Sequence, residues 1–90
     1  MASPPMRALT PDTIARATSE LIFALQVAFP EAELVPCDAI EGEAIHFEVR
    51  VPTADFDMDT AEERAIEIKQ GIEDRFGLYI LVRVTPHEIA

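Results

Sequence analysis

The sequence predicts an α+β fold, a two-layer sandwich in the order α-β-β-α-β. Its sheet is expected to be mixed and three-stranded, with two helices on one face. Three observations predict this class. Apolar residues recur at helical spacing in two long segments, apolar and polar residues alternate in two shorter ones, and proline or glycine stands near most of the junctions.

The first expected helix begins at Thr10-Pro11 and ends before Pro30. The Thr10 hydroxyl can accept from free backbone amides, and proline is tolerated at the first helical position. A stripe at helical spacing forms the core-facing side: Ile14, Ala17, Leu21, Leu25 and Ala28. Three further apolar residues lie off this stripe: Ile22, Phe23 and Val27. They predict a subunit contact, because a helix that is apolar nearly all round is usually covered on more than one side.

Two strands are expected next, over residues 34–39 and 44–51, joined by a turn at Glu41-Gly42. Pro36 cannot donate to a ladder, so the first of them is expected at an edge of the sheet. The second alternates clearly. One set of side chains faces the core, Ile45, Phe47, Val49 and Val51, and the other faces away, Ala44, His46, Glu48 and Arg50. The face that carries His46 is therefore expected to be open.

The second helix is expected from about residue 60 to residue 76. Two overlapping capping boxes over residues 59–63 predict its start, and Gly77 suits a left-handed C-terminal cap. Gly71 lies inside the helix, where glycine costs about 1 kcal/mol relative to alanine. We expect Gly71 to mark a close contact with the sheet or with the other helix.

The last strand is expected over residues 78–85 and is expected to end at Pro86. It completes a βαβ unit with the second strand and second helix, so the two strands should lie parallel and adjacent. The whole arrangement resembles a ferredoxin-like fold without its first strand. Its open face carries Tyr79 and Leu81, and its last strand has an unprotected edge, which favours homodimerisation.

Size and charge restrict the classes of partner. The 90 residues predict a flexible lead-in over residues 1–9 and a single domain over residues 10–90. The net charge of −10 argues against nucleic acid and against anionic membrane surfaces. No apolar run reaches the roughly 20 residues that a bilayer requires, and the single cysteine, Cys37, excludes a disulfide scaffold. A cytoplasmic protein with a protein partner is expected.

Candidate chemistry is sparse in this sequence. The only imidazoles are His46 and His87, and Glu48 lies two residues from His46 on the same strand face. These three are the candidate ligands for a divalent metal such as zinc, with a dimer supplying the remaining donors. The aspartates over residues 55–59 have the alternate spacing of a calcium loop without its glycine and terminal glutamate. No catalytic residues, cofactor motif or phosphate loop can be assigned, and an enzyme is not expected.

Three segments carry a resemblance to a known family: HFEV at 46–49, MDTAEERAI at 58–66 and ILVRVTPHE at 80–88. They are similar to the cytoplasmic C-terminal domain of cation diffusion facilitator transporters. The resemblance implies a metallochaperone-like fold that dimerises around zinc or related ions. His46 matches a histidine of the family, whereas Ala65 and Arg83 stand where two others are usual.

Two functions are therefore hypotheses. The first is a small homodimeric interaction or regulatory module without catalytic activity, which uses the open sheet face and the apolar end of the first helix. The alternative is a regulatory or carrier domain that binds a divalent metal.

Overall fold

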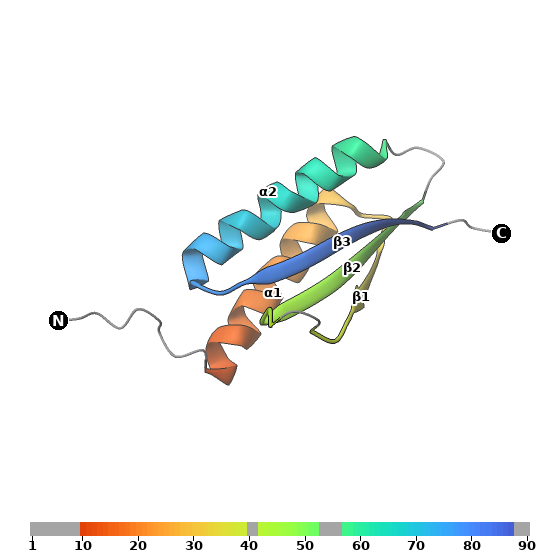
Figure 1. Ribbon diagram of the computed structural model, residues 1–90. Coiled ribbons are helices and arrows are strands. Elements are labelled where there is room, and N and C mark those ends of the chain that lie inside the picture. The colour runs from red at the N-terminus through yellow and green to blue at the C-terminus, as the bar shows by residue number, and fades with distance from the viewer. Residues whose placement is uncertain (1–9, 40–41, 53–56, 88–90) are drawn as a thin grey trace.

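The computed structural model describes residues 10–39, 42–52 and 57–87 and shows a three-stranded sheet with two helices against one face (Figure 1). The elements follow the order α-β-β-α-β, which confirms the expected fold class: α1 (Pro11–Ala28), β1 (Glu33–Pro36), β2 (Ile45–Pro52), α2 (Met58–Phe76) and β3 (Ile80–His87). The expected lead-in over residues 1–9, Glu41 of the turn and Asp55 of the aspartate series lie outside the described residues.

Strand β2 is the centre of the sheet. Strand β1 pairs with it antiparallel, from Glu33 opposite Arg50 to Pro36 opposite Phe47. Strand β3 pairs with its other side in parallel, from Ile45 opposite Ile80 onward without a break in register. The parallel neighbours expected of the βαβ unit are confirmed, and so is the edge position of β1.

The core lies between the sheet and the helix pair. Every second residue of β2, from Ile45 to Val51, is buried against the helices, as the alternation predicts. The core stripes of the helices supply the opposing layer, with Ala17, Leu21 and Leu25 from α1 and Ala61, Ala65 and Ile72 from α2. Alanines at the helix contact allow the two helices to lie side by side over a narrow sheet.

Helix α1 begins and ends where the sequence predicts. The Thr13 amide donates to the Thr10 hydroxyl oxygen at 3.1 Å, and Pro11 occupies the first turn. At the other end the Phe29 amide donates to the Leu25 carbonyl oxygen at 2.8 Å, and Pro30 follows. Phe29 is itself buried, so the end of α1 is also held by packing.

Helix α2 begins two residues earlier than expected. Its N-cap is Asp57, whose carboxylate accepts from the Asp59 amide and from the Thr60 hydroxyl, each at 3.1 Å. The capping boxes predicted over residues 59–63 are therefore wrong. Met58 explains the difference, because its side chain packs against the core from the first turn of the helix. Gly77 caps the other end with φ of 69°, as expected.

The strand bounds also differ from expectation: β1 begins one residue earlier, β2 spans Ile45–Pro52 and β3 begins at Ile80. Strand β1 ends at Pro36 rather than at residue 39, although the Cys37 amide still donates to the His46 carbonyl oxygen at 2.9 Å. Strand β3 continues through Pro86 to His87 rather than ending before the proline. Proline is tolerated there because β3 is an edge strand, and a missing N–H on its outer side removes no bond of the ladder.

The expected close contact at Gly71 is wrong. Apart from its chain neighbours and the adjacent backbone of α2, no described atom lies within 4 Å of the position that a β-carbon would occupy at this residue, and the residue is exposed. Gly71 instead lines a groove between the two helices, to which it contributes no side chain.

Neither helix in the described part of the chain combines the length and the hydropathy that crossing a bilayer requires.

Replacement by alanine should have opposite effects on stability at Gly71, within α2, and at Gly77, its C-cap. Gly71→Ala should raise the free energy of unfolding by about 1 kcal/mol, because it restores helix propensity at an unobstructed position. Gly77→Ala should lower it by about 1 kcal/mol, because alanine is strained at a positive φ. Urea denaturation at a protein concentration low enough to keep the chain monomeric measures both, because association would otherwise add to the apparent stability. Equal shifts of the same sign would contradict the assignment.

Candidate functional site

The sheet face opposite the helices is less open than the alternation predicts. His46, expected to be exposed there, is 5% exposed, and Glu43 beside it is 4% exposed. Two described residues between β1 and β2, Asp38 and Glu43, lie against the His46 imidazole at this end of the face. The expectation of an exposed His46 is therefore wrong, because these neighbours contact its ring.

The contacts of His46 determine which ring nitrogen carries a proton. Its Nδ1 lies 2.8 Å from the Asp38 carbonyl oxygen, which can only accept, so Nδ1 is the donor. The Glu43 carboxylate lies 3.7 Å from the same nitrogen. The other nitrogen, Nε2, is buried and has no hydrogen-bond partner among the described residues. His46 is thus a packed, anchored side chain at the start of β2.

Glu48 lies in the middle of the same face and is held by its neighbours. Its carboxylate accepts from the Thr85 hydroxyl at 2.9 Å and from Arg50 at 3.4 Å. The Thr85 hydrogen bond is the main reason that the pKa of Glu48 lies below its ordinary value of 4.5, with Arg50 and Arg83 adding in the same direction and partial burial opposing. Glu48 is therefore held in its ionised form.

The described residues do not assemble the predicted metal ligands into one site. One nitrogen of His46 is bound to backbone, and both oxygens of Glu48 are bound to side chains on its own sheet. His87 ends β3, and its side chain lies outside the described part of the chain. Within that part, no group of three His, Cys, Asp or Glu side chains is placed to hold a metal ion. Metal binding through these residues stays a prediction.

The predicted contact residues divide into exposed and half-buried ones. Phe23 is 69% exposed and Val27 is 64% exposed on α1, so both lie off the core stripe as expected. Ile22 is half-buried and packs against the core from the flank of α1. On the sheet side Tyr79 is 51% exposed beneath the Lys69 ammonium, and Leu81 is half-buried.

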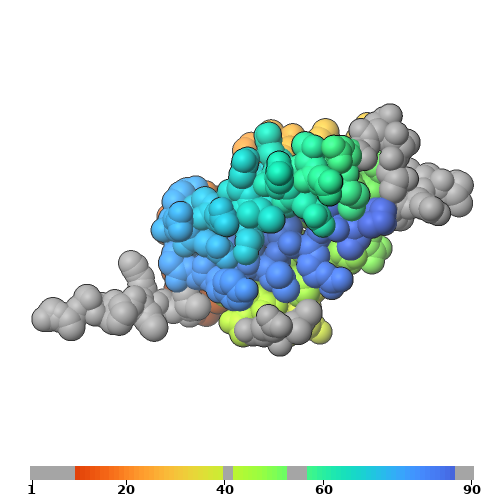
Figure 2. Space-filling view, turned by 45° about the horizontal axis from the view of Figure 1, so that its top comes forward, coloured from red at the N-terminus to blue at the C-terminus, as the bar shows by residue number. Residues whose placement is uncertain are grey.

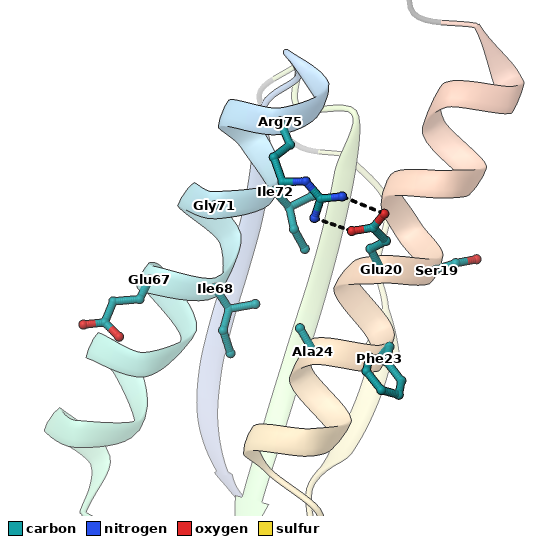
Figure 3. Close-up of a pocket in the computed structure, with 9 residues that line it drawn as sticks. All are labelled: Ser19, Glu20, Phe23, Ala24, Glu67, Ile68, Gly71, Ile72 and Arg75. Atoms are coloured by element: carbon teal, nitrogen blue, oxygen red, sulfur yellow. Dashed lines mark hydrogen bonds and ion pairs between the residues drawn. The ribbon is translucent and has the colours of Figure 1, made fainter.

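A groove between α1 and α2 adjoins the exposed Phe23. It encloses about 560 Å³, and both helices contribute to its walls: Ser19, Glu20, Phe23 and Ala24 from α1, and Glu67, Ile68, Gly71, Ile72 and Arg75 from α2. Apart from Glu20, Glu67 and Arg75, the lining residues are small or apolar. Figure 3 shows Ala24 and Ile68 on facing sides of the groove, and Glu67 directed away from it.

One ion pair spans the groove at the C-terminal end of α2. Both guanidinium nitrogens of Arg75 donate to the Glu20 carboxylate, and the Nη2–Oε2 distance is 2.9 Å (Figure 3). Because both side chains are largely exposed, this pair adds little to stability. Its two contacts bridge the helices and limit the groove at that end.

Sequence reasoning missed two residues of the molecular surface. Gly71 was assigned to a tight contact although it lies at the groove. Ile66 is 44% exposed on α2 and faces away from the core stripe of that helix. Its position outside the stripe of residues 61, 65, 68 and 72 was a signal that could have identified it.

Comparisons with known protein families, curated proteins and solved structures found no match to this chain. The resemblance to the cytoplasmic domain of cation diffusion facilitators therefore stays a prediction.

The environment of Glu48 predicts a measurable titration. Thr85→Val should raise the pKa of Glu48 toward 4.5, because it removes the main hydrogen bond to the ionised form. Since the folded pKa is the lower one, ionised Glu48 stabilises the fold above pH 4.5, and this contribution disappears as the pH falls through the folded value. Carbon-detected NMR titration of the side-chain carboxyl measures the shift.

Thr18→Val is the matched control for that experiment. It also removes a half-buried hydroxyl, which donates to the Ile14 carbonyl oxygen at 2.7 Å on α1. The pKa of Glu48 should not change in this variant. An unchanged pKa in Thr85→Val would show that the hydroxyl does not stabilise the carboxylate.

Proposed function

We propose that the protein is a non-catalytic, homodimeric interaction module, with its self-association surface on the helix layer. The observation that carries this proposal is the exposed Phe23 beside the groove at Gly71. A large apolar side chain and a hollow that could receive one lie on the same face of the same molecule.

This combination suits pairing with a second copy. A two-fold interface is formed by the same patch on both molecules, so the patch must be complementary to itself. Phe23 can enter the groove of the second copy while the groove of its own molecule receives the corresponding ring. Gly71 favours this arrangement, because it adds no side chain to the groove and no atom of another described segment lies within 4 Å of its β-carbon position.

The size of the exposed apolar residues supports the same conclusion. Phe23 and Val27 lie one helical turn apart, so they form a continuous apolar strip along the outer side of α1. Aromatic side chains at the centre of an interface commonly contribute most of its binding free energy. Burial of this strip would cover the two large apolar side chains of α1 that the described residues leave exposed.

Phe23→Glu is expected to dissociate the dimer. A charged side chain in the apolar groove of the second copy should weaken association by about 30-fold or more, the effect of losing a central interface residue. Sedimentation equilibrium over a concentration series measures the dissociation constant. A wild-type chain that is monomeric at about 50 µM would contradict the proposal.

Two further variants separate the groove from the helix in general. Ala15→Glu adds the same charge to an exposed position of α1 on the flank away from α2 and should leave association unchanged. Gly71→Leu fills the hollow without harming helix propensity, so it should weaken association while the monomer stays folded. Tight dimers of Gly71→Leu would place the contact elsewhere on the molecule.

A further inference from the structure

Strand β3 offers a second surface, which lies on the outer edge of the sheet. The Ala44 amide donates to the Tyr79 carbonyl oxygen at 2.9 Å, and from there the parallel register with β2 is unbroken. Backbone groups of a strand point alternately to its two sides. The odd-numbered residues of β3 therefore direct their N–H and C=O groups toward β2, and the even-numbered residues direct theirs outward.

The outward-facing groups are protected at both ends of β3. At the start, the Ile80 amide donates to the Glu73 carboxylate at 2.8 Å, and the Ile80 carbonyl oxygen accepts from Lys69 at 3.1 Å. At the end, Pro86 has no N–H to offer. Between them, Val82 and Val84 present two N–H and two C=O groups outward, spaced as the rungs of an antiparallel partner strand require.

A groove runs beside these exposed groups. It has a volume of about 450 Å³ and lies between α2 and β3, with Glu62 and Ile66 on the helix side and residues 82–85 on the strand side. Figure 2 shows β3 between α2 and β2 on this face, with its atoms exposed along the strand. Val82 and Val84 are only half-buried because nothing in the described part of the chain covers this edge.

Arg83 determines which kind of strand fits. It lies between the two valines, and its side chain is exposed on the sheet face away from the helices. It makes no salt bridge with another described residue, because Glu48, its partner across the ladder, is bound by Thr85 and Arg50. An added strand would place one side chain directly opposite Arg83.

A second copy of β3 fits this edge poorly. The N–H and C=O groups of both valines are all bonded in one antiparallel register only. That register sets Val82 of one copy opposite Val84 of the other, and it sets Arg83 opposite the same arginine of the other copy. Like charges directly opposite each other destabilise a strand pair. A shift of two residues either way sets a valine opposite Ile80, whose groups are already bonded, or opposite Pro86, which lacks an N–H.

We propose that the β3 edge binds an extended segment of another protein by strand addition, with an acidic side chain opposite Arg83 and an apolar side chain on either side of it. Strand addition takes its affinity from main-chain hydrogen bonds and its specificity from alternate side chains. The acidic side chain pairs with Arg83 on the open face. The two apolar side chains lie on the helix side, where Val82, Val84 and exposed Ile66 form the apolar part of the walls beside Glu62.

The net charge of −10 does not remove this preference. Charges farther apart than about 8 Å are largely screened at physiological ionic strength, so the side chain directly opposite dominates. The nearest carboxylate on the same face, Glu48, is held by Thr85 and Arg50 and leaves Arg83 as the cation that an added strand meets.

The test uses a fluorescein-labelled heptapeptide, Gly-Thr-Val-Glu-Val-Thr-Gly, at 0.15 M salt. Its matched controls carry Lys in place of the central Glu, or methyl groups on both valine amide nitrogens. The wild-type protein should bind the Glu peptide about fivefold more tightly than the Lys peptide. The methylated peptide should not bind, because its valines no longer donate to the edge.

Charge exchange in the protein provides the decisive comparison. Arg83→Glu changes an exposed side chain, so the fold should persist, and the variant should prefer the Lys peptide over the Glu peptide. In amide-exchange NMR of the free wild type, the amides of Val82 and Val84 should exchange faster than those of Leu81 and Arg83. The Glu peptide should slow exchange at both valines.

Three results would overturn the proposal. The first is a lack of shifts at Val82 and Val84 with about 1 mM Glu peptide. The second is a ratio of affinities for the Glu and Lys peptides that is the same in Arg83→Glu as in the wild type. The third is protection of both valine amides in the free protein that is lost on dilution, since a second copy would then occupy the edge. Phe23→Glu should bind the Glu peptide as the wild type does, which separates this surface from the helix groove.

Discussion

The burial of one face of β2 is the constraint on which the rest of the structure depends. Among the described strands it alone has neighbours on both edges, and every second side chain from Ile45 to Val51 is buried under the helix layer. A shift of one residue in its register would place His46, Glu48 and Arg50 in the core. The orientation of β2 therefore determines which face of the sheet α1 and α2 cover.

The short chain covers this central strand unequally. Two helices cover one face of the three strands, and the described residues form no second layer on the other face. At one end of that face the His46 imidazole is bound to the Asp38 carbonyl oxygen and is buried beside Glu43. The rest of the face carries Glu48, Arg50 and Thr85 in a network of hydrogen bonds, which suits contact with water.

Two separate surfaces remain for partners, and their chemistry differs. The helix groove combines Phe23 with a hollow at Gly71, so apolar shape would govern its contacts. The β3 edge presents backbone groups of Val82 and Val84 around Arg83, so hydrogen bonding and charge would govern binding there. Because α2 lies between them, with Gly71 on one side and Ile66 on the other, the module we propose can associate with itself and hold a partner strand at the same time.

Local patterns in the sequence determined the element order, the core stripes of both helices and the buried face of β2, because these depend on spacing along one segment. The exposure of Phe23 and Val27 also follows from spacing, since both lie off the stripe of α1. Contacts between distant segments were decided only by the tertiary structure. The burial of His46 requires Asp38, eight residues away, and the hollow at Gly71 requires the separation of two helices that Glu20 and Arg75 bridge across 55 residues. Whether β3 continues through Pro86 depends likewise on which of its edges faces β2. The spacing of apolar residues indicates which side of a helix or strand is apolar. Whether that side is buried or exposed depends on the other segments that pack against it.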